Sequence, residues 1–387
     1  MANSMRCVGL DVHVRETQAA VLDLGTGEVS YRRIRGRPHE VVPYLEGLEG
    51  PLRAVYEAGP TGYGLARRAR ERGLDVGVCA PGHILRRRQD RIKTDKRDAE
   101  RLARLLLAGE LRLVHVPEPW QEELRDVVRC REDLRVDLMR TRHRISKLLL
   151  RRERYFPGPG RAWTHRHRDW LSGLRFADRA SQVVLSDYLH AHDVLLARRE
   201  RVEAELFELA LASPFAQTVR NLRCLRGIDT LSAVGLCCEV LDFERFRAKQ
   251  LGSFLGLVPS EDSTGEEQRR GSITKAGSKH ARRLLVEAAW HYRHQPYVSD
   301  KLRRRQLGCD PRAVDIAWRA QRRLYRRWQR LAGERGKLET KVAVAVAREL
   351  SCFCWEIATS TNGPNNGDTA AGAARSDDGN GAIQGRA

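Results

Sequence analysis

Four acidic residues in the first third of the chain stand where they could meet around a metal ion. Asp11 ends the first apolar segment, Glu57 ends a later one, and Asp95 and Asp98 open a helical segment. Residues three apart lie on one face of a helix. Clustered carboxylates repel one another unless divalent cations lie among them, and their hard oxygen ligands suit Mg²⁺ or Mn²⁺. Two such ions can activate a nucleophile and stabilise the leaving oxygen in phosphodiester chemistry.

The segments that carry these acids alternate between strand-like and helix-like patterns. Strands are predicted at 7–11, 17–22, 29–34, 53–57 and 75–79, and helices at 40–48, 64–71 and 95–108. This βββαβαβα order is typical of an α/β unit of the ribonuclease H kind, in which strands one and four are adjacent at the sheet centre. Asp11 and Glu57 would then project side by side. Taken singly, Asp95 and Asp98 could be helix-start acids favoured by the helix dipole, but the four together favour a metal site.

A second group of reactive and cationic residues lies between 255 and 283. Small and basic residues surround Ser263-Thr264-Gly265. A hydroxyl there could attack phosphorus while nearby cations neutralise the phosphate oxygens. The residue types alone favour a simpler alternative, a polar loop that binds nucleic acid without taking part in catalysis. The cations assigned to nucleic-acid binding in this region are Arg269, Arg270, Lys275, Arg282 and Arg283.

The remaining segments are predominantly helical. Apolar residues spaced three and four apart predict two long helices within 119–215, joined by a loop that contains 156–160. We predict an antiparallel, projecting coiled coil, with ordinary helical core as the alternative. Residues 225–233 resemble a helix-hairpin-helix turn, whose backbone amides can hold a phosphate, although a glycine between two helices is common.

A strongly basic helical segment lies near the end. Residues 301–337 carry 13 Lys or Arg against three acids, and we predict that this segment lies on nucleic acid, with Arg322, Arg323, Arg326 and Arg327 on phosphates. Three aromatic residues on the same helix are expected to pack into the protein: Trp318, Tyr325 and Trp328.

The composition points to a polyanionic partner. Lys and Arg total 70 against 50 Asp and Glu, a formal net charge of +20. No apolar run is long enough for a membrane span and no secretory signal is evident, so we expect a soluble, cytoplasmic, nucleoid-associated protein. The nine cysteines contain no C-x-x-C pair and are expected to be reduced, and the Gly/Ala/Asn-rich tail at 359–387 is expected to be disordered.

Several blocks together resemble the DEDD insertion-sequence transposases, the family numbered one hundred and ten. The similarity spans roughly residues 6–357, in these blocks: Gly9-Leu10-Asp11, Tyr56-Glu57-Ala58-Gly59-Pro60-Thr61-Gly62, Lys93-Thr94-Asp95-Lys96-Arg97-Asp98-Ala99, Gly256-Leu257-Val258-Pro259, Ser263-Thr264-Gly265, Ile273-Thr274-Lys275-Ala276-Gly277 and Ala345-Val346-Ala347-Arg348-Glu349-Leu350.

This resemblance implies a RuvC-like catalytic domain (1–118) with the tetrad Asp11, Glu57, Asp95 and Asp98, a coiled-coil connector (119–215) and a mainly α transposase domain (216–358). It further implies that Ser263 is the nucleophile that forms a covalent intermediate with DNA, with Thr264 as the alternative. A homo-oligomer and a structured guide RNA encoded by the element are also implied. The expected function is therefore DNA cutting and rejoining.

Two other functions stay open on the residues alone. One is a RuvC-like endonuclease or Holliday-junction resolvase that uses metal-activated water. The other is a non-enzymatic nucleic-acid scaffold, which the intact tetrad argues against. The recombinase and the endonuclease differ in their products, since only a recombinase leaves rejoined strands and a protein–DNA adduct.

Overall fold

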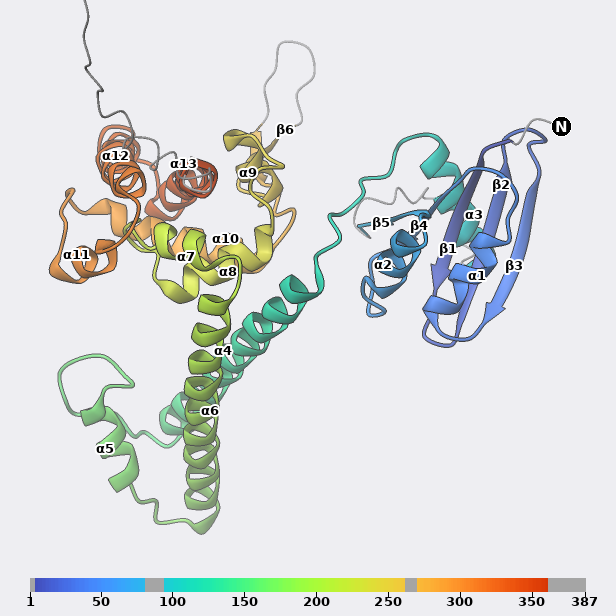
Figure 1. Cartoon of the computed structure of the whole chain (residues 1–387). Helices are drawn as coiled ribbons and strands as arrows, with labels where there is room; N and C mark the ends of the chain where they lie inside the picture. Colours follow the sequence, from blue (N-terminus) through green and yellow to red (C-terminus); the bar gives the residue numbers. More distant parts are fainter. Residues whose placement is uncertain (1–3, 81–93, 262–269, 361–387) are drawn as a thin grey trace, which may run out of the picture. The chain divides into compact units, whose positions relative to one another are not determined.

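The computed structural model describes residues 4–80, 94–261 and 270–360, with the side chain of 270 excepted (Figure 1). The chain divides into two compact units, Met1–Pro119 and Trp120–Ala387, and each is described by itself.

The first unit contains a five-stranded sheet. Its strands are β1 (Arg6–Val12), β2 (Glu16–Asp23), β3 (Val29–Arg35), β4 (Leu52–Glu57) and β5 (Asp75–Cys79). They lie in the order β3-β2-β1-β4-β5, with β1 antiparallel to β2 and parallel to β4. The prediction that strands one and four are adjacent is therefore confirmed, because β1 and β4 pair at the centre of the sheet.

The described part of this unit also contains three α-helices: α1 (Val41–Glu46), α2 (Gly64–Glu71) and α3 (Asp95–Leu107). The predicted element order is confirmed. The helix predicted at 40–48 is shorter at both ends, since Pro38–Glu40 forms a 3₁₀ turn before α1 and Gly47 caps its end after Glu46.

Each face of the sheet has its own apolar core. Alternate residues of β1 point to opposite sides, so Val8 and Leu10 pack with α1 and α2 while Cys7 packs with α3. A Cβ added at Gly9 would overlap the backbone of Ala99 and Ala103 in α3. The missing side chain therefore lets α3 lie directly against β1.

The second unit is mostly helical. Its helices are α4 (Pro119–Arg151), α5 (His165–Gly173), α6 (Arg179–Ala212), α7 (Ala216–Leu222), α8 (Thr230–Val240), α9 (Ala248–Phe254), α10 (Lys279–Ala289), α11 (Asp300–Gln306), α12 (Pro311–Gln329) and α13 (Glu339–Ser360). A two-stranded sheet pairs β6 (Pro259–Glu261) with β7 (Arg270–Ile273). A 3₁₀ turn (Trp290–Arg293) follows α10, and a π-turn (Arg330–Glu334) follows α12.

The long helices α4 and α6 run antiparallel. Leu124, near the start of α4, shares a core with Leu206, near the end of α6, whereas Ile145 and Leu185 share a second core. An Arg131–Glu203 ion pair of 2.6 Å joins the two helices between these cores. The predicted pair of long helices is confirmed, and α5 interrupts the predicted loop between them. Coiled-coil geometry stays a prediction.

The core of the second unit surrounds α13. Its buried residues include Val342, Val346 and Leu350, and it packs against α9, α10 and α12. Among the ranges described above, none of the helices combines the length and apolarity that a bilayer span requires.

Candidate functional site

Asp11 and Glu57 lie at the same end of two neighbouring parallel strands. Leu10 of β1 pairs with Tyr56 of β4, so the next residues, Asp11 and Glu57, stand at the same level. Alternation along the strands places Asp11 on the side of Gly9, which is the side that α3 covers. Glu57 shares that side with Val55, whose side chain belongs to the α3 core. Both residues therefore lie on the side of the sheet that α3 covers.

The beginning of α3 supplies the other two predicted acids. Thr94 caps the helix, since its hydroxyl oxygen accepts a hydrogen bond from the backbone N–H of Arg97. Asp95 and Asp98 then fall in the first turn. A guanidinium nitrogen of Arg101 lies 3.6 Å from Asp98 Oδ1 and orients that carboxylate.

Asp11, Asp95 and His13 converge most closely. One ligand atom from each of them lies within 4.8 Å of the other two. His13 Nε2 lies 3.3 Å from Asp11 Oδ2. Burial raises the pKa of the Asp11 carboxyl, His13 lowers this pKa, and the charges of Asp95 and Asp98 raise it. The position therefore concentrates negative charge that a divalent cation would neutralise.

The donor set fits such a cation. Two carboxylates supply oxygen ligands, which suit Mg²⁺ and Mn²⁺, and an imidazole nitrogen is a better ligand for Mn²⁺ than for Mg²⁺. His13 is not among the residues predicted from the sequence. The available signal was its spacing, because His13 follows Asp11 by two residues and so continues the same side of the strand.

The four predicted acids are not equally close. Asp11 and Asp95 belong to the converging group, and Asp98 is near enough for its charge to act on Asp11. Glu57 is outside that group and pairs across the sheet with Cys79. Burial, with the Glu57 charge as a second cause, raises the pKa of the Cys79 thiol to about 11.

The predicted nucleophile falls in a part of the chain outside the described residues. Ser263, Thr264 and Arg269 lie there, between β6 and β7. The base of this hairpin is described. Arg282 donates hydrogen bonds to the carbonyl oxygens of Leu255 (2.8 Å) and Ala276 (2.7 Å), which ties the two arms together.

Two glycines make this base compact. Gly256 (φ +66°) and Gly277 (φ +65°) adopt left-handed backbone conformations, and a Cβ on either would overlap the backbone of the opposite arm. The backbone around Gly256 therefore packs closely against that of Ala276, and the backbone around Gly277 against that of Phe254.

The residues near this hairpin that were predicted to bind nucleic acid differ in how free their side chains are to contact it. Lys275 is exposed, whereas the side chain of Arg270 is outside the described residues. Arg283 forms ion pairs with Glu132 (2.7 Å) and Glu287 (2.8 Å). Since Arg282 is also bonded within the protein, both arginines have structural roles in this conformation.

The glycine turn predicted at 225–233 is present between α7 and α8. Gly227 has φ +84°, and Asp229 caps α8 by accepting a hydrogen bond of 2.8 Å from the backbone N–H of Ser232. Arg305 donates a hydrogen bond to the carbonyl oxygen of Ile228 (2.7 Å). Phosphate binding at this turn stays a prediction.

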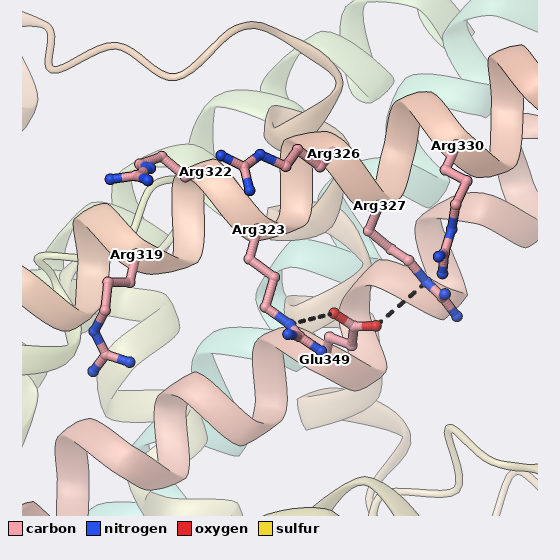
Figure 2. Close-up of a pocket in the computed structure, with 7 residues that line it drawn as sticks. All are labelled: Arg319, Arg322, Arg323, Arg326, Arg327, Arg330 and Glu349. Atoms are coloured by element: carbon pink, nitrogen blue, oxygen red, sulfur yellow. Dashed lines mark hydrogen bonds and ion pairs between the residues drawn. The ribbon is translucent and has the colours of Figure 1, made fainter.

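The basic segment forms α11, α12 and the π-turn after α12. The expectation that its aromatic residues all pack inward is wrong, because Trp318 is 37% exposed. Trp328 is buried and packs against Trp290, with ring centroids 5.4 Å apart. One side of α12 therefore enters the core, and its arginines line an open groove on the other side (Figure 2).

Models of known protein families match the part of the chain that carries the acidic site and the part that carries the β6–β7 hairpin. A transposase model of the DEDD, IS110 type matches residues 8–157, and a model described as the transposase IS116/IS110/IS902 family matches residues 219–303. The transposase-named protein y4qE of Sinorhizobium fredii is 40% identical over 358 residues, which cover 91% of this chain and 88% of that protein. The chain belongs to the IS110 transposase family.

Other relatives agree with this IS110 assignment. The transposase for insertion sequence element IS1533 of Leptospira borgpetersenii is 33% identical over 341 residues, which cover 86% of this chain and 98% of that protein. The transposase of element IS1328 of Yersinia enterocolitica is 34% identical over 117 residues, or 30% of this chain. The predicted family is therefore confirmed, and the chain is an insertion-sequence transposase.

Proposed function

We propose that this IS110 transposase cuts and rejoins DNA at a divalent-metal site built on β1, β4 and α3, in a unit of the RuvC-like, ribonuclease H kind. The observation that carries the proposal is the convergence of Asp11, His13 and Asp95 within 4.8 Å. Asp11 and Asp95 would hold the ion through oxygen and His13 through nitrogen, with Asp98 and Glu57 beside them. A bound divalent ion would stabilise negative charge on the oxygens of a phosphodiester under attack.

We also propose that Ser263 supplies the nucleophile. Its Oγ would form a bond to phosphorus as the bond from phosphorus to a deoxyribose oxygen breaks. The hydroxyl proton leaves and the departing oxygen gains one, so no water is consumed. Attack by a second DNA end on the same phosphorus would reverse this exchange and rejoin the strands. The family resemblance supports this proposal, because its Ser-Ser/Thr-Gly motif falls on Ser263-Thr264-Gly265.

Partner proposals follow from the family resemblance and the charge. A net charge of +20 suits contact with the backbone of donor and target DNA. We propose that a structured guide RNA encoded by the element selects the target, as the resemblance to the family implies. We further propose that the protein acts as a homo-oligomer at the nucleoid. Sequencing of RNA that co-purifies with the protein, compared with the DNA flanking the gene, tests the guide.

A trapping experiment tests the chemistry. The wild-type protein is incubated with a nicked suicide DNA substrate and Mg²⁺, denatured, and examined for a protein–DNA adduct. We expect an adduct with the wild type and none with Ser263→Ala or in excess chelator. An adduct that survives in Ser263→Ala and disappears in Thr264→Ala would assign the nucleophile to Thr264. Nicking without an adduct in any variant would instead support the hydrolytic nuclease.

A further inference from the structure

The groove on α12 is lined almost entirely by cations. Its volume is about 530 Å³, and its lining consists of Arg319, Arg322, Arg323, Arg326, Arg327, Arg330 and Glu349. Glu349 belongs to the Ala345–Leu350 block of α13, to which the catalytic proposal assigns no role. Figure 2 shows the arginines extending from α12 and its continuation, with the carboxylate of Glu349 between the guanidinium groups of Arg323 and Arg327.

Three of these arginines are held by carboxylates. Arg319 lies 3.0 Å from Asp315 and 2.6 Å from Glu356. Glu349 bridges the other two, since its Oε2 lies 3.1 Å from Arg323 Nε and its Oε1 lies 3.3 Å from Arg327 Nε (Figure 2). These three guanidiniums are therefore held by carboxylates of the protein, and the single charge of Glu349 is shared between Arg323 and Arg327.

The other three arginines have no such partner within the described part of the chain. Arg322, Arg326 and Arg330 are exposed, and they form no ion pair with any described residue. They are spaced four residues apart, so they lie along one side of the helix with a rise of about 6 Å between neighbours. Like charges at this spacing destabilise a helix, and an extended anion would relieve that repulsion.

We propose that this arginine groove binds the phosphodiester backbone of nucleic acid, and that Glu349 limits its strength by holding Arg323 and Arg327. This inference rests on the proposed function, in which the chain acts on nucleic acid. The lining offers five-donor guanidiniums to phosphate oxygens. It contains no aromatic side chain on which a base could stack. Contacts from these guanidiniums to phosphate oxygens carry no information about base sequence.

The salt dependence of binding measures how many phosphates the groove neutralises. Full-length protein is titrated, in excess chelator so that metal-dependent cleavage is absent, into a 30-base-pair DNA duplex and into an RNA duplex of the same sequence. The variant combines Arg322→Ala, Arg326→Ala and Arg330→Ala. Losing three phosphate contacts lowers the slope of log affinity against log salt by about 2.7 for duplex DNA. Between 50 and 200 mM salt, the wild type then loses about 40-fold more affinity than the variant.

A gain of binding in Glu349→Gln is the sharper test. This variant releases Arg323 and Arg327, so we expect tighter binding and a slope steeper by up to about 1.8. A purely structural role for Glu349 would give weaker binding instead. The thermal midpoint of each variant, measured beside its binding curve, shows that the protein is folded.

A control variant removes the same charge elsewhere in the second unit. It combines Arg179→Ala, Arg198→Ala and Arg201→Ala, three exposed residues of α6. An equal fall of the slope in this control, or an unchanged slope in the groove variant, would overturn the proposal. So would weaker binding by folded Glu349→Gln. If the groove variant lowers the slope with only one of the two duplexes, the groove is assigned to that nucleic acid.

The proposed chemistry can fail independently of this groove. The trapping experiment reads adduct formation at Ser263, whereas these titrations read affinity without cleavage. A missing adduct with altered slopes would leave the groove intact and refute only the catalytic proposal.

Discussion

A methyl group at Gly9 should separate α3 from the central strand and weaken the metal site. In Gly9→Ala the added Cβ overlaps the backbone of Ala99 and Ala103, and backbone cannot move aside as a flexible side chain can. Overpacking of a close contact costs about 1–3 kcal/mol. The displacement also carries Asp95 away from Asp11, since Asp95 opens the helix that moves.

Hydrogen exchange followed by mass spectrometry localises this effect to the first unit. A loss of about 1–3 kcal/mol makes the protected amides of β1 and α3 exchange about 5- to 150-fold faster, because local opening becomes that much more frequent. Mn²⁺ binding, followed by electron paramagnetic resonance, should weaken in parallel.

Gly64→Ala serves as the matched control. Gly64 begins α2 in the same unit, and a Cβ there would meet no atom within 4 Å. We expect this variant to exchange like the wild type or more slowly, because alanine reduces the freedom of the unfolded chain. Wild-type exchange and Mn²⁺ affinity in Gly9→Ala would refute the argument that this close contact positions the site.

Three other predictions concern the first unit. Asp11→Asn and Asp98→Asn should abolish strand cleavage without altering circular dichroism, because each removes a negative charge beside the ion, and full cleavage in excess chelator would contradict this. His13→Gln should weaken Mn²⁺ binding more than Mg²⁺ binding in calorimetry, since Mn²⁺ accepts imidazole nitrogen more readily; equal losses would remove His13 from the ligand set. The hydrogen bond from the Ser4 hydroxyl, with those from Gly25, Arg6 and Thr26, lowers the pKa of Asp23 to about 2. Its stabilising effect should therefore be present above its ordinary pKa near 3.8 and be lost as pH falls toward 2, and an NMR titration in which Asp23 keeps its ordinary pKa would disprove this.

The sequence determined the local elements of the first unit. Short apolar runs separated by turn residues correctly predicted five strands in order, and the bounds Gly64–Glu71 and Asp75–Cys79 agree with the structure. The apolar pattern of a strand and the residue types of a turn involve only a few neighbouring residues. They can therefore be recognised in the sequence without knowing the fold. The set of seven blocks from Gly9-Leu10-Asp11 to Ala345–Leu350, taken together, was also sufficient to predict the family.

The convergence of the acidic residues could be predicted only in part from the sequence. The topology predicted that Asp11, Glu57, Asp95 and Asp98 would share one side of the sheet. His13 joins Asp11 and Asp95 because of the conformation just after β1 and the close approach of α3 at Gly9. That approach depends on backbone contact between residues about 90 apart in sequence, which no local pattern records.

Only the tertiary structure decided which basic residues are available to bind nucleic acid. Arg283 pairs with Glu132, 151 residues earlier, and Arg323 pairs with Glu349, 26 residues later. Residue type and helical spacing predict that such arginines are charged and on which side of the helix they lie. Whether a carboxylate from another helix neutralises them depends on how the helices pack, and this separates Arg322 and Arg326 from Arg323 and Arg327 within one basic row.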